Sequence, residues 1–130
     1  MAFFTWNEDL RIGIEQIDNQ HKKYFEMLSD LHEAVDLGKG TDVSEALFQE
    51  LADYIGTHFS DEEALMDELN CPIKETQVKA HQGFIAKVKS LREKNTGNVS
   101  EEAFVFLRDW FAHHIMQLDK QIALCTPEKK

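Results

Sequence analysis

The stretch over residues 47–69 most constrains the fold, because its apolar residues recur every three or four positions. This rhythm predicts an amphipathic helix with one buried face. His58 and Glu62 lie on the same stripe one helical turn apart, so both side chains would enter the interior at nearly the same level. A buried glutamate is costly unless it is paired or binds a metal. The stripe therefore predicts a helix that carries metal ligands into a core, with an ordinary stabilising His–Glu pair on an exposed face as the alternative.

Three other segments show the same period, and we expect helices over residues 19–37, 72–94 and 101–124. Asp18 is the predicted N-cap of the first. Because the connections are short and no strand-like run is present, the sequence predicts an all-α fold, an antiparallel up-down-up-down four-helix bundle. Residues 1–17 have no helical period but many large apolar groups, with Trp6 as the expected anchor of an ordered N-terminal arm. We predict one domain over residues 1–130, with the arm at about 1–17 and the bundle at about 18–125.

The charge balance excludes some partners. The chain has 24 acidic and 14 basic residues and a formal net charge of −10, which would repel nucleic acid phosphates and anionic lipid. No stretch approaches the roughly 20 apolar residues that span a bilayer, and the first residues do not resemble a signal peptide. We therefore expect no nucleic acid partner, no membrane insertion and a cytoplasmic location. Cys71 and Cys125 are far apart and form no CxxC motif, so two free thiols are expected, with a disulfide as the alternative.

Each predicted helix also carries nitrogen or oxygen donors. In an antiparallel bundle these donors would meet at one end, because the donors of the first and third helices lie near the helix start and those of the second and fourth lie in the later half. The donors are His21, His58, Glu62, Gln77, His81, His114 and Asp119. Four histidines and two carboxylates exceed a tetrahedral zinc site, and the mixture suits iron or manganese better than calcium or magnesium. Since each carboxylate can bridge two metals, the residues predict a dinuclear iron centre. Asp61 and Glu63 fall off the buried stripe and are expected to be solvated.

The spacing of residues along the helices indicates which neighbouring side chains can reach the predicted site. His114 and Asp119 are five positions apart, or about 140° around an ideal helix, so they do not share a face. We therefore predict a local widening between them, such as a π-bulge. His113 is the competing candidate and is expected at the surface. His32 lies roughly 16 Å beyond His21 along the helix axis, too far to share one small site, and Tyr24 is expected to serve packing.

These motifs together carry a family resemblance. A lone His21 is followed by His58 and Glu62 as HxxxE, by Gln77 and His81 in the place of HxxxH, and by His114 and Asp119 as HxxxxD. The arm around Trp6, the stretch over residues 17–21 and Pro72 before the third helix match as well. On these residues the chain resembles the bacterial hemerythrins over nearly its whole length.

The resemblance implies a function and a role for each residue. It implies reversible O2 binding at a carboxylate-bridged, non-haem centre of two iron ions, for oxygen storage, transport or scavenging and not for enzymatic turnover. A protein partner that receives O2 is part of this expectation. Glu62 and Asp119 would bridge the two irons. One iron would be held by His21 and His58, and this iron would bind O2. The other iron would be held by His81 and His114, and an apolar wall around the O2 position would consist of Phe59, Trp110, Phe111 and Ile115.

Gln77 departs from the family pattern, which has a histidine at this position. A glutamine can offer a weak carbonyl ligand, leave the position to water or turn away from the metal. An opened position would allow a second function, a di-iron redox enzyme that acts on peroxide or nitric oxide. A third reading is an O2- or redox-sensing module.

Overall fold

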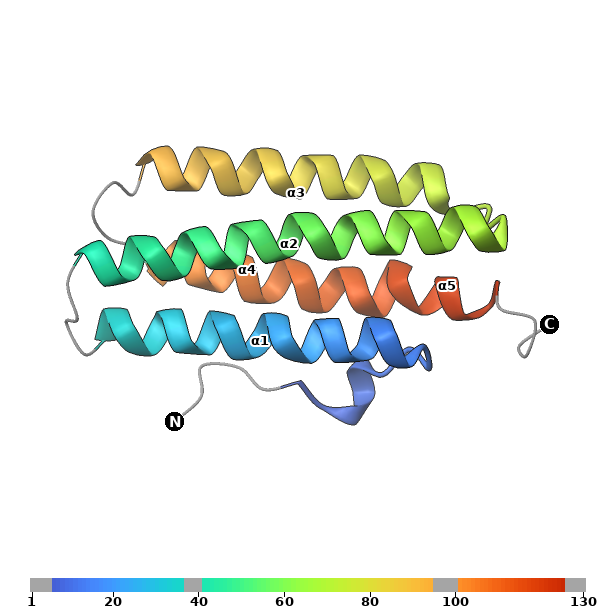
Figure 1. The fold of residues 1–130 in the computed structure, drawn as a ribbon, viewed down its shortest axis with the longest axis horizontal. Coiled ribbons are helices and arrows are strands. Elements are labelled where there is room, and N and C mark those ends of the chain that lie inside the picture. The colour runs from blue at the N-terminus through green and yellow to red at the C-terminus, as the bar shows by residue number, and fades with distance from the viewer. Residues whose placement is uncertain (1–5, 37–40, 95–100, 126–130) are drawn as a thin grey trace.

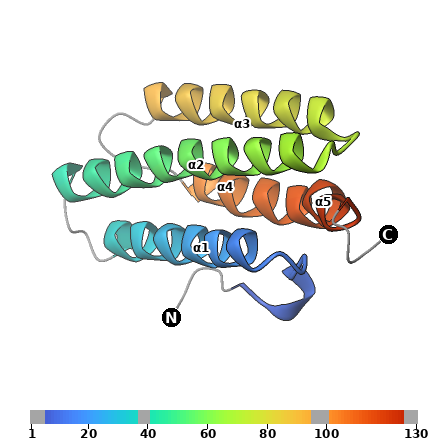
Figure 2. The same cartoon turned by 45° about the vertical axis from the view of Figure 1, so that its right-hand side comes forward.

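The computed structural model of the protein describes residues 6–36, 41–94 and 101–125. Four long helices form the bundle: α1 (Glu15–Asp36), α2 (Thr41–Leu69), α3 (Lys74–Lys94) and α4 (Glu101–His114). Figure 1 shows successive helices running in opposite directions, and Figure 2 shows α2 between α1 and α3 from a second angle. The last helix continues through a π-helix, η2 (Ile115–Asp119), into α5 (Lys120–Ala123). The predicted all-α, up-down-up-down bundle is confirmed.

The first helix begins earlier than predicted, and Asp18 is not its N-cap. α1 starts at Glu15, so Asp18 lies inside the first turn of the helix and is buried. Its carboxylate accepts the backbone N–H of Ile12 at 2.8 Å and of Gly13 at 3.1 Å. Gly13 has a φ of 92°, a conformation that glycine adopts without steric cost. Asp18 thus fastens the arm to the bundle instead of capping the helix.

The described part of the arm is ordered against the bundle, as predicted. It contains a short 3-10 helix, η1 (Glu8–Leu10), and buries Leu10 and Ile12 in the main core. Trp6 packs against this core, with the cations of Arg11 and Lys22 at 5.2 and 4.5 Å from its ring centroid. Residues 1–5 lie outside the described part of the chain.

A disulfide joins the α2–α3 turn to the end of α5. Cys71 and Cys125 are separated by 54 positions in sequence, yet their Cα atoms are 5.6 Å apart. The C-terminus of α2 and the C-terminus of the last helix lie at the same end of the bundle, which brings the two cysteines together. The expectation of two free thiols was therefore wrong. Within the described ranges, no helix is long and apolar enough to cross a bilayer.

Candidate metal centre

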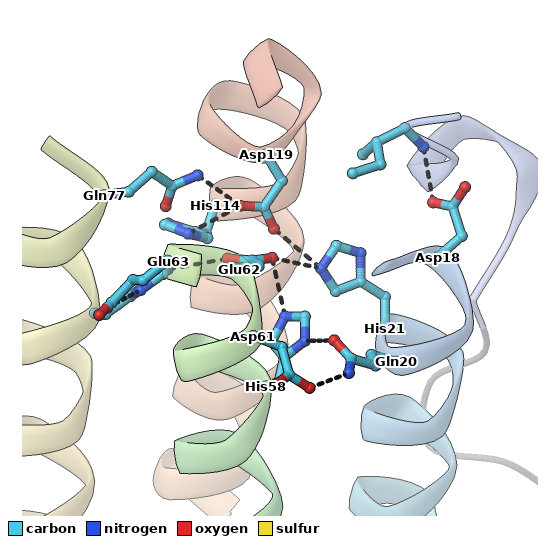
Figure 3. A network of polar contacts seen from close by, with 12 residues as sticks. Asp18, Gln20, His21, His58, Asp61, Glu62, Glu63, Gln77, His114 and Asp119 are labelled. Carbon is cyan, nitrogen blue, oxygen red and sulfur yellow. Dashed lines mark hydrogen bonds and ion pairs between the residues drawn. The ribbon is translucent and has the colours of Figure 1, made fainter. Parts of the chain in front are cut away.

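The seven predicted donor residues lie together at the end of the bundle where α1 and α3 begin and α2 and η2 end. All seven are at most 5% exposed: His21, His58, Glu62, Gln77, His81, His114 and Asp119. Figure 3 shows side chains from α1, α2, α3 and η2 pointing toward a common centre, with Glu62 and Asp119 in the middle. The antiparallel arrangement therefore places these donors as the sequence predicted.

The donors form two groups that share both carboxylates. One group contains His21, His58, Glu62 and Asp119, the other contains His81 and His114 with the same carboxylates, and the donor atoms of a group lie within 4.8 Å of one another. Glu62 places Oε2 at 3.0 Å from His58 Nε2 and Oε1 at 3.1 Å from His81 Nε2. Asp119 places Oδ2 at 3.0 Å from His21 Nε2 and Oδ1 at 3.2 Å from His114 Nε2. Each carboxylate thus presents one oxygen to each group, which is how a bridging ligand is arranged.

The hydrogen-bonding state of these atoms fits a metal site. In the described part of the chain, eight buried side-chain nitrogen or oxygen atoms have no hydrogen-bond partner, and five of them are atoms through which the clustered histidines and carboxylates face one another: His58 Nε2, Glu62 Oε1, His81 Nε2, His114 Nε2 and Asp119 Oδ2. Buried polar groups are normally satisfied because an unsatisfied one costs free energy. Metal coordination would use the lone pairs of these carboxylates and imidazoles. Since imidazole and carboxylate donors together suit iron, the chemistry of the cluster fits a pair of iron ions.

The electrostatics of the cluster also call for positive charge. Burial opposes a charge on His21, but its hydrogen bonds to Asp119 and Glu62 outweigh burial and raise its pKa to about 9. Burial likewise opposes the ionised form of Glu62, yet the charge of His58 and hydrogen bonds from the surrounding histidines hold the Glu62 pKa well below its usual value. The pKa of His81 is raised by Glu62 against the effect of burial. The two carboxylates therefore favour positive charge at this centre, which protons on His21 and His81 or bound metal ions can supply.

The π-helix explains how His114 and Asp119 share the site. Residues Ile115–Asp119 adopt the wider turn, which adds one residue per turn and brings Asp119 onto the face of His114. The predicted widening is confirmed. His113 is exposed, and its Nδ1 lies 3.1 Å from the carbonyl oxygen of Asp109, so it belongs to the surface as expected.

Three polar residues that the sequence did not assign to the site orient two of the histidines through hydrogen bonds at Nδ1, one of them indirectly. Gln20 Oε1 accepts from His58 Nδ1 at 2.7 Å, and Gln20 Nε2 donates to Asp61 Oδ2 at 2.8 Å. Glu63 Oε2 accepts from His81 Nδ1 at 2.9 Å. A proton fixed on Nδ1 leaves Nε2 to face the metal positions. The expectation that Asp61 and Glu63 are merely solvated was wrong, and their adjacency to Glu62 was the available signal.

Aromatic rings enclose the donors. The Phe59 ring stacks on His81 with centroids 3.8 Å apart, and the Trp110 ring stacks on His114 at 4.6 Å. Phe111 lies 5.6 Å from the ring of His21 and 5.7 Å from that of His58. Ile115 is fully buried in the same core. These contacts surround the donors with apolar groups.

Two other polar residues lie outside the donor set, as predicted. Tyr24 is fully buried, its hydroxyl donates to the Leu107 carbonyl at 2.9 Å, and its ring stacks on Phe111. His32 packs its ring against Phe104, with Nδ1 at 3.5 Å from a carboxylate oxygen of Asp36. Tyr24 therefore serves packing, and His32 is satisfied away from the cluster.

Comparison with known proteins agrees with this geometry. The profile described as the hemerythrin HHE cation binding domain matches residues 12–123. The bacteriohemerythrin of Stenotrophomonas maltophilia is 36% identical over 125 residues, which cover 95% of this chain and 81% of that protein. The bacteriohemerythrin of Pseudomonas aeruginosa is 35% identical, with 92% and 78% covered.

More distant relatives extend the match. The myohemerythrin of Sipunculus nudus is 28% identical over 89% of this chain and 88% of its own length. A solved structure of wild-type hemerythrin superimposes with a TM-score of 0.88 at 26% identity, covering 95% of this chain and 98% of that one. The chain belongs to the hemerythrin family, and it binds O2 at a non-haem di-iron centre.

Proposed function

We propose that the protein is a reversible O2 carrier, used for oxygen storage, transport or scavenging, and not an enzyme. The observation that carries this proposal is the burial of the donor cluster, whose seven residues are at most 5% exposed, so an organic substrate in solution does not reach the donors. Two surface grooves, of about 470 and 380 Å³, are lined by residues other than the seven donors. An organic substrate placed in either groove would not touch the cluster.

The donor geometry supports a role for each residue. Glu62 and Asp119 would bridge the two irons, and the iron pair, when bound, supplies the electrons that hold O2. His21 and His58 would hold one iron, at which O2 binds, and the other would be held by His81 and His114. Gln20 and Glu63 orient two of these imidazoles through Nδ1.

The apolar wall would protect the O2 position. We propose that it consists of Phe59, Trp110, Phe111 and Ile115, of which Phe111 lies against the rings of both His21 and His58. Apolar side chains there exclude water and stray protons. Exclusion of both would slow loss of the oxy form and oxidation of the iron.

An optical spectrum tests the carrier proposal. The iron-loaded protein is reduced without oxygen and measured before O2 is added, after it is added, and after it is removed under vacuum. We expect a visible band that appears with O2 and vanishes with its removal. The same cycle in His114→Ala should show no such band, whereas His113→Ala should behave as wild type because His113 is exposed. A spectrum that stays in the oxidised form after the first exposure would contradict reversible binding.

Gln77 supports one alternative. It is fully buried beside the cluster, but its Nε2 donates to Asp119 instead of offering a ligand nitrogen. An enzyme that reduces peroxide or nitric oxide would use the iron position left open there. Gln77→His separates the two functions, since a carrier should gain a longer-lived oxy form while an enzyme adapted to the open position should lose turnover.

The protein partner that receives O2 and the cytoplasmic location stay predictions.

A further inference from the structure

The two donor groups have the same composition. Each contains two histidines together with Glu62 and Asp119, and each residue offers one donor atom to its group. The two oxygens of each carboxylate are divided between the groups. The protein's donors therefore distinguish the two metal positions only if Gln77 adds a ligand to the second group.

The orientation of Gln77 is fixed by Asp119. Gln77 is fully buried, and its Nε2 donates to Asp119 Oδ1 at 2.8 Å. Reversing the amide would place Oε1 against the carboxylate oxygen, where two acceptors would meet with no proton between them. The hydrogen bond thus keeps Nε2 toward Asp119, and an amide NH2 group is a donor of protons and not a metal ligand.

The other end of the amide is left unsatisfied. Gln77 Oε1 is buried and has no hydrogen-bond partner among the described residues. Figure 3 shows the Gln77 amide at the edge of the cluster, with its nitrogen toward Asp119. A buried acceptor in this state lacks a proton donor, and a water molecule bound to iron in the second position would supply one.

We propose that Gln77 positions Asp119 and does not bind iron, so both iron positions keep a coordination site open to a small exogenous ligand such as azide. This inference rests on the proposed di-iron function. Two imidazoles and two carboxylate oxygens leave non-haem iron with positions that small ligands can fill. The two irons then differ in their apolar surroundings and not in their protein ligands.

An azide titration of the oxidised, iron-loaded protein tests this inference. The number of azide molecules bound per iron pair is measured from the azide-to-iron absorption band and, independently, by calorimetry. We expect two in wild type and one in Gln77→His, because the new imidazole would fill the second position. Gln82→His places the same imidazole on the exposed surface of α3 and should still bind two. Gln77→Leu should also bind two, since the inference assigns no ligand to Gln77.

One azide per iron pair in wild type would overturn the inference. If Gln77→Leu then bound two, Oε1 would be identified as the ligand that had blocked the second position. Metal analysis of the same samples separates this failure from failure of the di-iron function. A chain that holds two irons but one azide refutes only the role of Gln77, whereas a chain that does not hold two irons refutes the proposed site.

Discussion

The Nδ1 hydrogen bonds of His58 and His81 are expected to affect how well these two candidate ligands bind a metal. His81 is backed by a carboxylate, Glu63, whereas His58 is backed by the neutral amide of Gln20. A carboxylate on Nδ1 makes the imidazole a more basic ligand and holds its orientation. The two sides of the centre therefore receive different support from residues that do not touch the metals.

Glu63→Gln should weaken metal binding. The substitution keeps an acceptor near His81 Nδ1 but removes its negative charge, and loss of such a partner typically costs about 10- to 100-fold in metal affinity. Competition with a chromophoric chelator, using Co²⁺ or Fe²⁺, measures the change. Glu68→Gln is the matched control, because Glu68 is exposed on the same helix. Equal affinities for the two variants would show that Glu63 gives no support to the site.

The stability of the metal-free protein should fall as the pH rises above neutrality. The folded-state pKa of His21 is about 9, above its ordinary value near 6.5, so the protonated form stabilises the fold. This contribution is complete below about pH 6.5 and is lost as the pH rises through 9. Its upper limit is about 3 kcal/mol, and it includes the interaction that lowers the Glu62 pKa, so the two shifts are not added.

Thermal melts of the metal-free protein between pH 6 and 9.5 measure this effect. We expect the midpoint to decrease over this interval in wild type and in His113→Gln, whose altered residue is exposed. His21→Gln removes the titrating group and should show a smaller decrease. A midpoint independent of pH in wild type would mean that His21 is not held protonated by the two carboxylates.

At the scale of elements, the disulfide is expected to stabilise the end of the bundle that carries the cluster. It joins the turn between α2 and α3 to Cys125, the second residue after α5, and α5 directly follows Asp119. For a loop of this length, the chain-entropy relation gives about 4 kcal/mol. Cys71→Ser with Cys125→Ser should lower the free energy of unfolding by up to that amount and speed the release of iron to a chelator.

Urea unfolding and iron release, each with and without a thiol reductant, check the role of the disulfide. The reductant should move wild type toward the double serine variant and should leave that variant unchanged. If wild type released iron at the same rate with the disulfide intact and reduced, the link would not help to retain the metal.

The elements were predictable where their signal is local, and not where it depends on distant contacts. Apolar spacing indicated the four helices, and the five-residue interval from His114 to Asp119 indicated η2. Asp18 has the sequence character of an N-cap, but the backbone of the arm uses its carboxylate instead. Asp61 acts through Gln20 on another helix, and the cysteines pair across 54 positions. Such partners are set by the packing of helices, which periodicity alone does not give.

For the whole molecule, we expect metal binding at the cluster to increase the stability of the bundle. The candidate ligands come from α1, α2, α3 and the last helix, so a bound metal pair would connect all four parts of the bundle. Without metal, the bundle buries carboxylates and imidazoles that are incompletely hydrogen-bonded. Both effects favour the metal-bound form over the metal-free form.

Removal of the metal should therefore destabilise the entire bundle. A ligand that binds only the folded state adds about 4 kcal/mol when its free concentration is 1,000 times its Kd, which corresponds to a midpoint shift on the order of 10 °C for a domain of this size. Calorimetry of the iron-loaded and chelator-treated protein measures the shift. Mg²⁺ should not restore the midpoint, because it prefers oxygen ligands. His114→Ala should lose most of the metal-dependent increase in the melting midpoint, and His113→Ala should retain it. Equal midpoints for iron-loaded and metal-free wild type would show that the centre does not stabilise the bundle.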